Sequence, residues 1–205
     1  MSTTTGGTRL GRSDRVGLYM TIALGLIGIC AAAWTMVARL VEVLPGTDVP
    51  VRVPFIGETA DLPIGPGGAP VPVAVDEATV IVPQPAAATQ FAIVAEPIVY
   101  GVAIIVGITL LGLLCWNLAR GRAFTRSTVR IIGWGGGTLA IGWVVGSLFT
   151  TMSVNGALSA ISDYQYEGIT FGTNFGAMFG ILAIGAIGAA FQIGERLQRD
   201  TEGLV

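Results

Sequence analysis

The sequence contains no histidine and no lysine, so all eleven of its basic residues are arginine. Only two cysteines occur, Cys30 and Cys115. These absences exclude imidazole-based catalysis, imidazole metal ligation and a lysine nucleophile. We therefore predict no catalytic residue, no metal site and no cofactor, and we expect both cysteines to be unpaired thiols.

Charged residues are scarce as well. They make up 12% of the 205 residues, whereas 52% are hydrophobic, and the mean hydropathy is +0.73. A soluble domain does not have this composition. Crossing a bilayer core takes about 20 apolar helical residues. Four stretches meet that requirement, and we place membrane spans at residues 16–41, 97–118, 131–152 and 172–194.

The distribution of arginine predicts how the chain is oriented. Nine of the eleven arginines lie in the N-terminal tail (1–15), the second connection (119–130) and the C-terminal tail (195–205). Because arginine resists translocation, we predict a multi-pass protein of the plasma membrane with both termini in the cytoplasm. Ala31–Ala33 could instead end a cleavable secretory signal, but the apolar sequence that continues through Val37 favours a full span.

The segment 42–96, between the first two spans, has a different character. All ten prolines fall between Pro45 and Pro97, and we expect the segment not to be helical. Alternating apolar residues predict short strands at 51–55, 71–75 and 79–82, interrupted at Gly65–Gly68. The predicted fold is thus an all-α integral membrane protein: a four-helix transmembrane bundle with a small β-rich extracytoplasmic cap at 42–96. A second outer loop covers 153–171. The cap is too small to be stable unless it packs on the helix ends, and it either covers the bundle or contacts a ligand.

Glycines recur along the third and fourth spans at the spacing that permits close helix approach. Such positions serve either the packing of one bundle or a homodimer. The predicted packing positions are Gly133, Gly137, Gly142, Gly146, Gly172, Gly176 and Gly180.

Charges near the outer ends of the helices form a predicted rim cluster of Arg39, Glu42 and Glu96. We interpret it as a junction between helices and cap, with ligand capture as the alternative. Apart from Arg39 at the outer end of the first span, the spans hold no arginine, aspartate or glutamate, which argues against ion-coupled transport. A passive transporter or channel subunit with a glycine-rich helical bundle remains an alternative function.

The inner arginines are candidates for binding anionic lipid headgroups or a cytosolic protein. Four of them share the second connection without interleaved aromatic residues, so we predict no direct contact with nucleic acid. The same connection also predicts the start of the next helix. We expect Gly121 to end one helix, Thr125 to cap the next, and Phe124 to pack against Val129. The candidate binding residues are Arg120, Arg122, Arg126, Arg130, Arg196 and Arg199.

Two motifs accompany this four-span layout, Gly121-Arg122-Ala123-Phe124-Thr125 and Gly194-Glu195-Arg196-Leu197, followed by the ending Leu204-Val205. Together they resemble a bacterial membrane family, the domain of unknown function numbered 2975. The resemblance implies four spans with a β-containing outer segment. It also implies a genetic neighbour, because relatives are often encoded beside small helix-turn-helix regulators. The hypothesis that follows is a non-enzymatic signalling protein whose arginine-rich inner face binds a cytosolic regulator.

Overall fold

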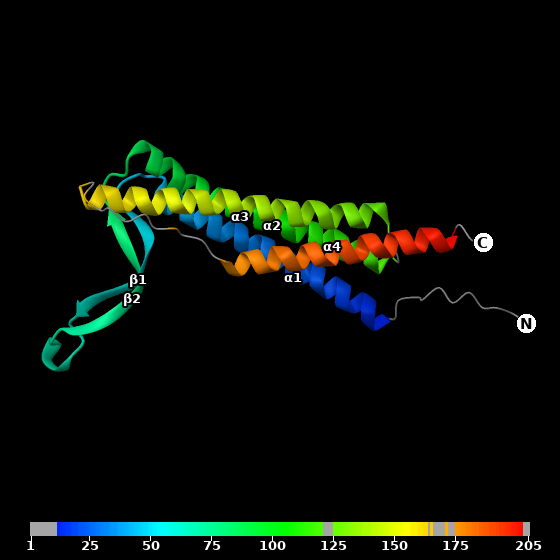
Figure 1. The fold of residues 1–205 in the computed structure, drawn as a ribbon, viewed down its shortest axis with the longest axis horizontal. Helices are drawn as coiled ribbons and strands as arrows, with labels where there is room; N and C mark the ends of the chain where they lie inside the picture. The colour runs from blue at the N-terminus through cyan, green and yellow to red at the C-terminus, as the bar shows by residue number, and fades with distance from the viewer. Residues whose placement is uncertain (1–11, 121–124, 164, 166–170, 172–174, 203–205) are drawn as a thin grey trace, which may run out of the picture. The chain divides into compact units, whose positions relative to one another are not determined.

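The structure, a computed structural model, describes residues 12–120, 125–163, 165, 171 and 175–202. Four long helices account for most of them: α1 (Arg12–Val43), α2 (Ala87–Ala119), α3 (Arg126–Ile161) and α4 (Phe175–Glu202). Two strands follow α1 in the sequence and precede α2: β1 (Val49–Leu62) and β2 (Val71–Val82). They form an antiparallel pair (Figure 1). The predicted combination of four helices and a small β element is therefore confirmed.

Each helix contains a stretch that is long and apolar enough to cross a membrane. These stretches are Val16–Val43, Ala87–Ala119, Arg126–Ile161 and Gly176–Leu197. They indicate a membrane protein, because their length and apolar composition match the hydrocarbon core of a bilayer.

All four helices extend beyond the predicted spans, and α2 and α3 do so by the most residues. Helix α2 begins at Ala87 rather than at Pro97, and α3 continues past residue 152 to Ile161. Our expectation that all of 42–96 is non-helical is thus wrong for residues 42–43, which end α1, and for residues 87–96, which begin α2. Those residues are rich in alanine, the best helix former, and Pro97 inside α2 removes only one backbone hydrogen bond. The predicted spans are limited to about the length that crosses a bilayer, whereas a helix can continue beyond the bilayer.

The described residues divide into two compact units, and all four helices contribute to the first. That unit is made from Met1–Val37, Val99–Val144 and Phe175–Val205. Neighbouring helices approach closely at glycines. A Cβ on Gly28 of α1 would lie 3.2 Å from Ile108 of α2. A Cβ on Gly107 of α2 would lie 3.0 Å from Leu139 of α3.

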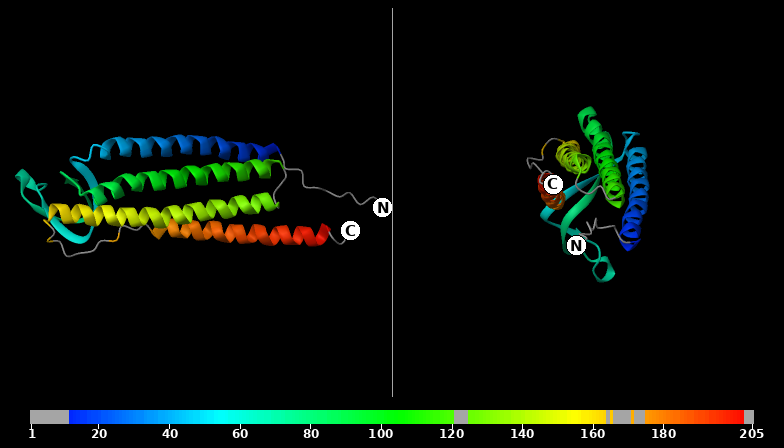
Figure 2. Two further views of the ribbon diagram at one scale, coloured as in Figure 1. Left: turned by 90° about the horizontal axis from the view of Figure 1, so that it is seen from above. Right: turned by 90° about the vertical axis from the view of Figure 1, so that its right-hand side faces the viewer.

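The third contact in this unit joins α3 to α4, where a Cβ on Gly188 would lie 3.2 Å from Ile132. Within the unit the helices thus lie side by side in chain order (Figure 2). Because glycine has no side chain, the helix backbones can approach closely at these points, and the closer contact strengthens dispersion attraction between the helices.

The predicted packing glycines differ in what surrounds them. A Cβ on Gly142 would overlap the side chain of Ala103 on α2. In contrast, no atom lies within 4 Å of a Cβ placed on Gly133, Gly137 or Gly180, as far as the structure describes the chain. Gly146 and Gly176 lie on α3 and α4, whereas Gly172 is outside the described residues.

Three glycines that the four-residue spacing does not single out also mark close approaches. A Cβ on Gly101 would lie 2.6 Å from the sulfur of Met36. Gly107 faces Leu139, as described above, and Gly156 faces Thr89 so closely that no side chain would fit. Spacing identifies glycines that share a helix face but not the face that meets a neighbour.

The second unit, Ala38–Ile98 with Val145–Asn174, holds the strands and the principal buried core. Alternate residues of β1 point into that core and meet the last residue of β2 and the ends of three helices. The core residues are Val43, Val49, Val51, Val53, Val82, Ile93, Val154, Ala157 and Leu158. The expectation that the cap packs on helix ends is therefore confirmed.

The strands form one long hairpin rather than several short strands. Val49 pairs with Val82 at its base and Leu62 with Val71 at its far end. The expected strands 71–75 and 79–82 are one continuous β2, because the register irregularity between Pro54 and Glu58 falls on β1 instead. A bulge of this kind kinks the ladder without ending it. The predicted interruption at Gly65–Gly68 is the hairpin turn, where Gly67 and Gly68 have positive φ angles of 70° and 81°.

Replacement of Gly142 by leucine is expected to prevent normal folding, because the new side chain would occupy the space of Ala103. Overpacking of this kind costs about 3 kcal/mol. Gly137→Leu, on the same helix, meets open space and should be tolerated. The measurement is the yield of monodisperse protein in detergent and its unfolding temperature. Equal yields and unfolding temperatures for the two variants would contradict the packing described.

Val82→Ala is expected to loosen the base of the hairpin, since Val82 is 0% exposed. The loss of two methyl groups and the resulting cavity should cost about 2 kcal/mol. The adjacent Ile81 is 61% exposed and provides the control, Ile81→Ala. Limited proteolysis of the hairpin in detergent micelles should proceed faster in Val82→Ala only. Similar cleavage rates in both variants would show that the core does not hold the hairpin.

Candidate functional site

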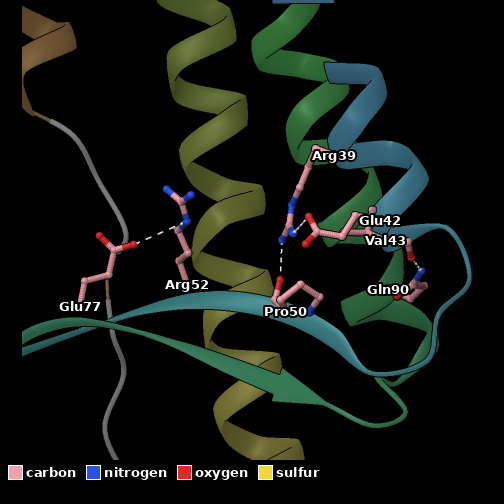
Figure 3. Close-up of polar contacts among 7 residues, drawn as sticks. All are labelled: Arg39, Glu42, Val43, Pro50, Arg52, Glu77 and Gln90. Carbon is pink, nitrogen blue, oxygen red and sulfur yellow. Dashed lines mark hydrogen bonds and ion pairs between the residues drawn. The ribbon is translucent and has the colours of Figure 1, made fainter. Parts of the chain in front are cut away.

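The end of α1 is tied to the hairpin by Arg39. Its Nη1 donates to Glu42 Oε2 at 2.6 Å, and its Nη2 donates to the carbonyl oxygen of Pro50 at 2.6 Å (Figure 3). Proline has no N–H for the ladder, so Pro50 can occupy a strand only where no donor is needed. The arginine therefore joins a helix end to a strand through that strand's backbone.

A second bond at the same helix end comes from α2. Gln90 donates from Nε2 to the carbonyl oxygen of Val43 at 2.6 Å, satisfying one of the acceptors that every helix leaves at its C-terminus (Figure 3). The other amide atom, Oε1, is buried without a protein partner in the described part of the chain. Nothing in the sequence points to Gln90, because a single amide in an alanine-rich run carries no recognisable signal.

Glu96 does not join this contact. Its Oε1 accepts a hydrogen bond from Thr150 Oγ1 at 2.8 Å, and its Oε2 accepts one from Ser153 Oγ at 3.3 Å. Ser153 is buried. The predicted rim cluster is thus two separate arrangements: Arg39 with Glu42 and the hairpin, and Glu96 with two hydroxyl groups of α3.

Each of these hydroxyl groups has a second acceptor within reach. Thr150 Oγ1 lies 3.1 Å from the carbonyl oxygen of Gly146, and Ser153 Oγ lies 2.9 Å from that of Thr150. A hydroxyl group has only one proton to donate. The carboxylate of Glu96 and the α3 backbone therefore compete for the same two protons.

The inner arginines occupy several different environments. The guanidinium of Arg120 lies 4.6 Å from the centre of the Trp116 ring. Arg126 Nε is 3.8 Å from Glu195 Oε1 on α4, a long ion pair to a carboxylate whose side chain is only 16% exposed. Arg130 and Arg196 are accessible: Arg130 is exposed on α3 and Arg196 on α4.

The predicted helix cap can be located in part. Thr125 Oγ1 accepts from the backbone N–H of Thr128 at 3.3 Å, which is the N-cap bond at the third helical position of α3. The two hydroxyl groups are also 3.0 Å apart. Gly121, Arg122 and Phe124 lie outside the described residues, as does the side chain of Arg199.

The cysteines are both free thiols. Among the residues that the structure describes, no group of three or more cysteine, aspartate or glutamate side chains could hold a metal ion.

Comparison with known proteins identifies no relative. No family model, no curated protein and no solved structure matches the chain. The resemblance to the family numbered 2975 stays a prediction based on its short motifs.

Thr150→Val is expected to destabilise the packing of α3 against α2. Valine keeps the shape of threonine but leaves one oxygen of Glu96 without its 2.8 Å donor. Loss of a hydrogen bond to a charged group costs about 1.5–3 kcal/mol. Thr151→Val, one residue along the same helix, is the matched control. Thermal unfolding followed by circular dichroism in micelles should separate the two, and identical curves would show that the bond does not contribute.

Proposed function

We propose that this chain is a non-enzymatic signalling or regulatory protein of the plasma membrane. Its termini lie in the cytoplasm, and its exposed inner arginines bind a cytosolic regulatory protein. The resemblance described above suggests a small helix-turn-helix regulator as that partner.

The separation of charge between the two units is the observation that carries the proposal. Side chains described in the first unit include four arginines, Arg120, Arg126, Arg130 and Arg196, and a single acid, Glu195. In the second unit the described side chains include two arginines, Arg39 and Arg52, and eight acids. Because arginine favours the cytoplasmic side, this separation supports a cytoplasmic location for the arginine-bearing helix ends of the first unit.

The ion pairing of the individual arginines supports a binding role for Arg130 and Arg196. Arg126 already faces Glu195, whereas Arg130 and Arg196 have no ion pair in the described part of the chain. Exposed cations without a counter-charge attract acidic surfaces and raise association rates. An acidic face on a regulator is therefore the complementary partner.

The experiment uses inside-out membrane vesicles that contain the full chain. Purified product of a neighbouring regulator gene is expected to sediment with these vesicles and not with right-side-out vesicles. Combined Arg130→Gln and Arg196→Gln should weaken binding roughly tenfold, because two exposed ion pairs of up to about 1 kcal/mol each are lost.

Arg52→Gln is the control, since Arg52 is an exposed arginine of the second unit. It should leave sedimentation unchanged. Binding to right-side-out vesicles, or equal loss in the control, would overturn the proposed orientation and partner surface. No binding of any neighbouring regulator would overturn the proposed function itself.

A further inference from the structure

An arginine and two aromatic side chains meet at the junction of α1 and α2 in the first unit. Trp116 lies in the last turn of α2, and Arg120 directly follows Ala119, the last residue of that helix. The backbone N–H of Arg120 still donates to the carbonyl oxygen of Trp116 at 3.2 Å, which keeps the two residues on one side of the helix end. The guanidinium of Arg120 lies 4.6 Å from the Trp116 ring centre. Trp116 also contacts Tyr19 of α1, edge to face, with ring centres 6.2 Å apart and ring planes at 71°. We name these three residues the aromatic–arginine site.

We propose that this site binds the phosphate of an anionic membrane lipid. The proposal is independent of the partner surface formed by Arg130 and Arg196. It assigns Arg120 to the membrane and leaves the other two arginines to the cytosol.

Both aromatic residues of the site are exposed over nearly half of their surface. Tyr19 is 49% exposed and Trp116 is 42% exposed. Apolar side chains one turn away or less, Val16 and Met20 on α1 and Leu113 on α2, are exposed as well. In a helix that crosses a bilayer, such a surface faces lipid, and tryptophan and tyrosine concentrate at the level of the headgroups.

No ion pair is formed by Arg120 with any residue that the structure describes. The ring of Trp116 attracts the cation but accepts none of its N–H groups in strong hydrogen bonds. A guanidinium has five such donors in a planar fork, which matches two oxygens of a phosphate.

Lipid fits this site better than a protein partner does. A phosphate at Arg120 would place its acyl chains along the exposed apolar residues of α1 and α2, where a soluble protein would have to compete with bilayer lipid. Arg130 and Arg196, in contrast, have no ring contact in the described part of the chain. An arginine stacked on aromatic rings suits the membrane–water interface, because the rings can face the apolar acyl chains while the guanidinium faces the charged headgroups.

The test is lipid retention by the purified full chain. Protein reconstituted in mixed micelles with equal phosphatidylglycerol and phosphatidylcholine is expected to retain phosphatidylglycerol preferentially, as measured by native mass spectrometry. Arg120→Gln should reduce this preference about fivefold, the effect of one charge near a lipid surface. Trp116→Phe should reduce it about twofold, because phenylalanine binds a cation less well.

Arg130→Gln removes the same charge elsewhere on the first unit and is the matched control. It should leave the preference unchanged. An equal decrease in Arg120→Gln and Arg130→Gln would mean unspecific attraction and would overturn the site. Displacement of the lipid by inorganic phosphate would show a site for free phosphate and would also overturn the proposal.

Arg120→Lys keeps the assay decisive if Arg120→Gln does not fold. Lysine retains the charge but not the planar fork, so an intermediate preference is expected. A preference equal to that of the unchanged protein would contradict bidentate binding.

Discussion

A polar group cannot be left unpaired in hydrocarbon, and the whole structure follows from that constraint. Backbone amides satisfy it by forming four uninterrupted helices, each with a stretch apolar enough to span a bilayer. Charged side chains satisfy it by lying away from the middle of each apolar stretch, as Arg39 and Glu42 do near the end of α1. The hairpin carries a further five of the described charges, Arg52, Glu58, Asp61, Asp76 and Glu77.

The hairpin depends on the helix ends. A two-stranded sheet is marginal by itself, and here its base is held by buried valines of both strands together with side chains from α1, α2 and α3. A hydrogen bond completes the attachment, because Arg39 of α1 donates to the carbonyl oxygen of Pro50 in β1. A second bond, from Gln90 of α2 to the carbonyl oxygen of Val43, joins the two helix ends. The prolines that weaken the ladder are compatible with this arrangement, because one of them presents a carbonyl to a helix instead.

The arginines illustrate how one residue type takes different roles. Arg126 pairs with an acid on the neighbouring helix, whereas the guanidinium of Arg120 lies over the ring of Trp116. If Arg120 holds a lipid phosphate, the first unit is anchored in one leaflet at a defined point. The regulator proposed above would then bind Arg130 and Arg196 on a surface whose depth in the membrane is set by that lipid.

Length, composition and charge order were sufficient to predict four apolar helices, a small β element after the first of them, and its attachment to helix ends. Those properties follow from local hydropathy and proline content, which act residue by residue. The sequence could not tell that residues 87–96 are helical, because helix length is not set by the thickness of a membrane. Tertiary structure alone decided that Gly142 meets Ala103 while Gly137 meets nothing within 4 Å, and that Glu96 turns to Thr150 rather than to Arg39. Each of these outcomes depends on the rotation of one helix against its neighbour, and a periodic pattern of small residues defines the faces of a helix without choosing between them.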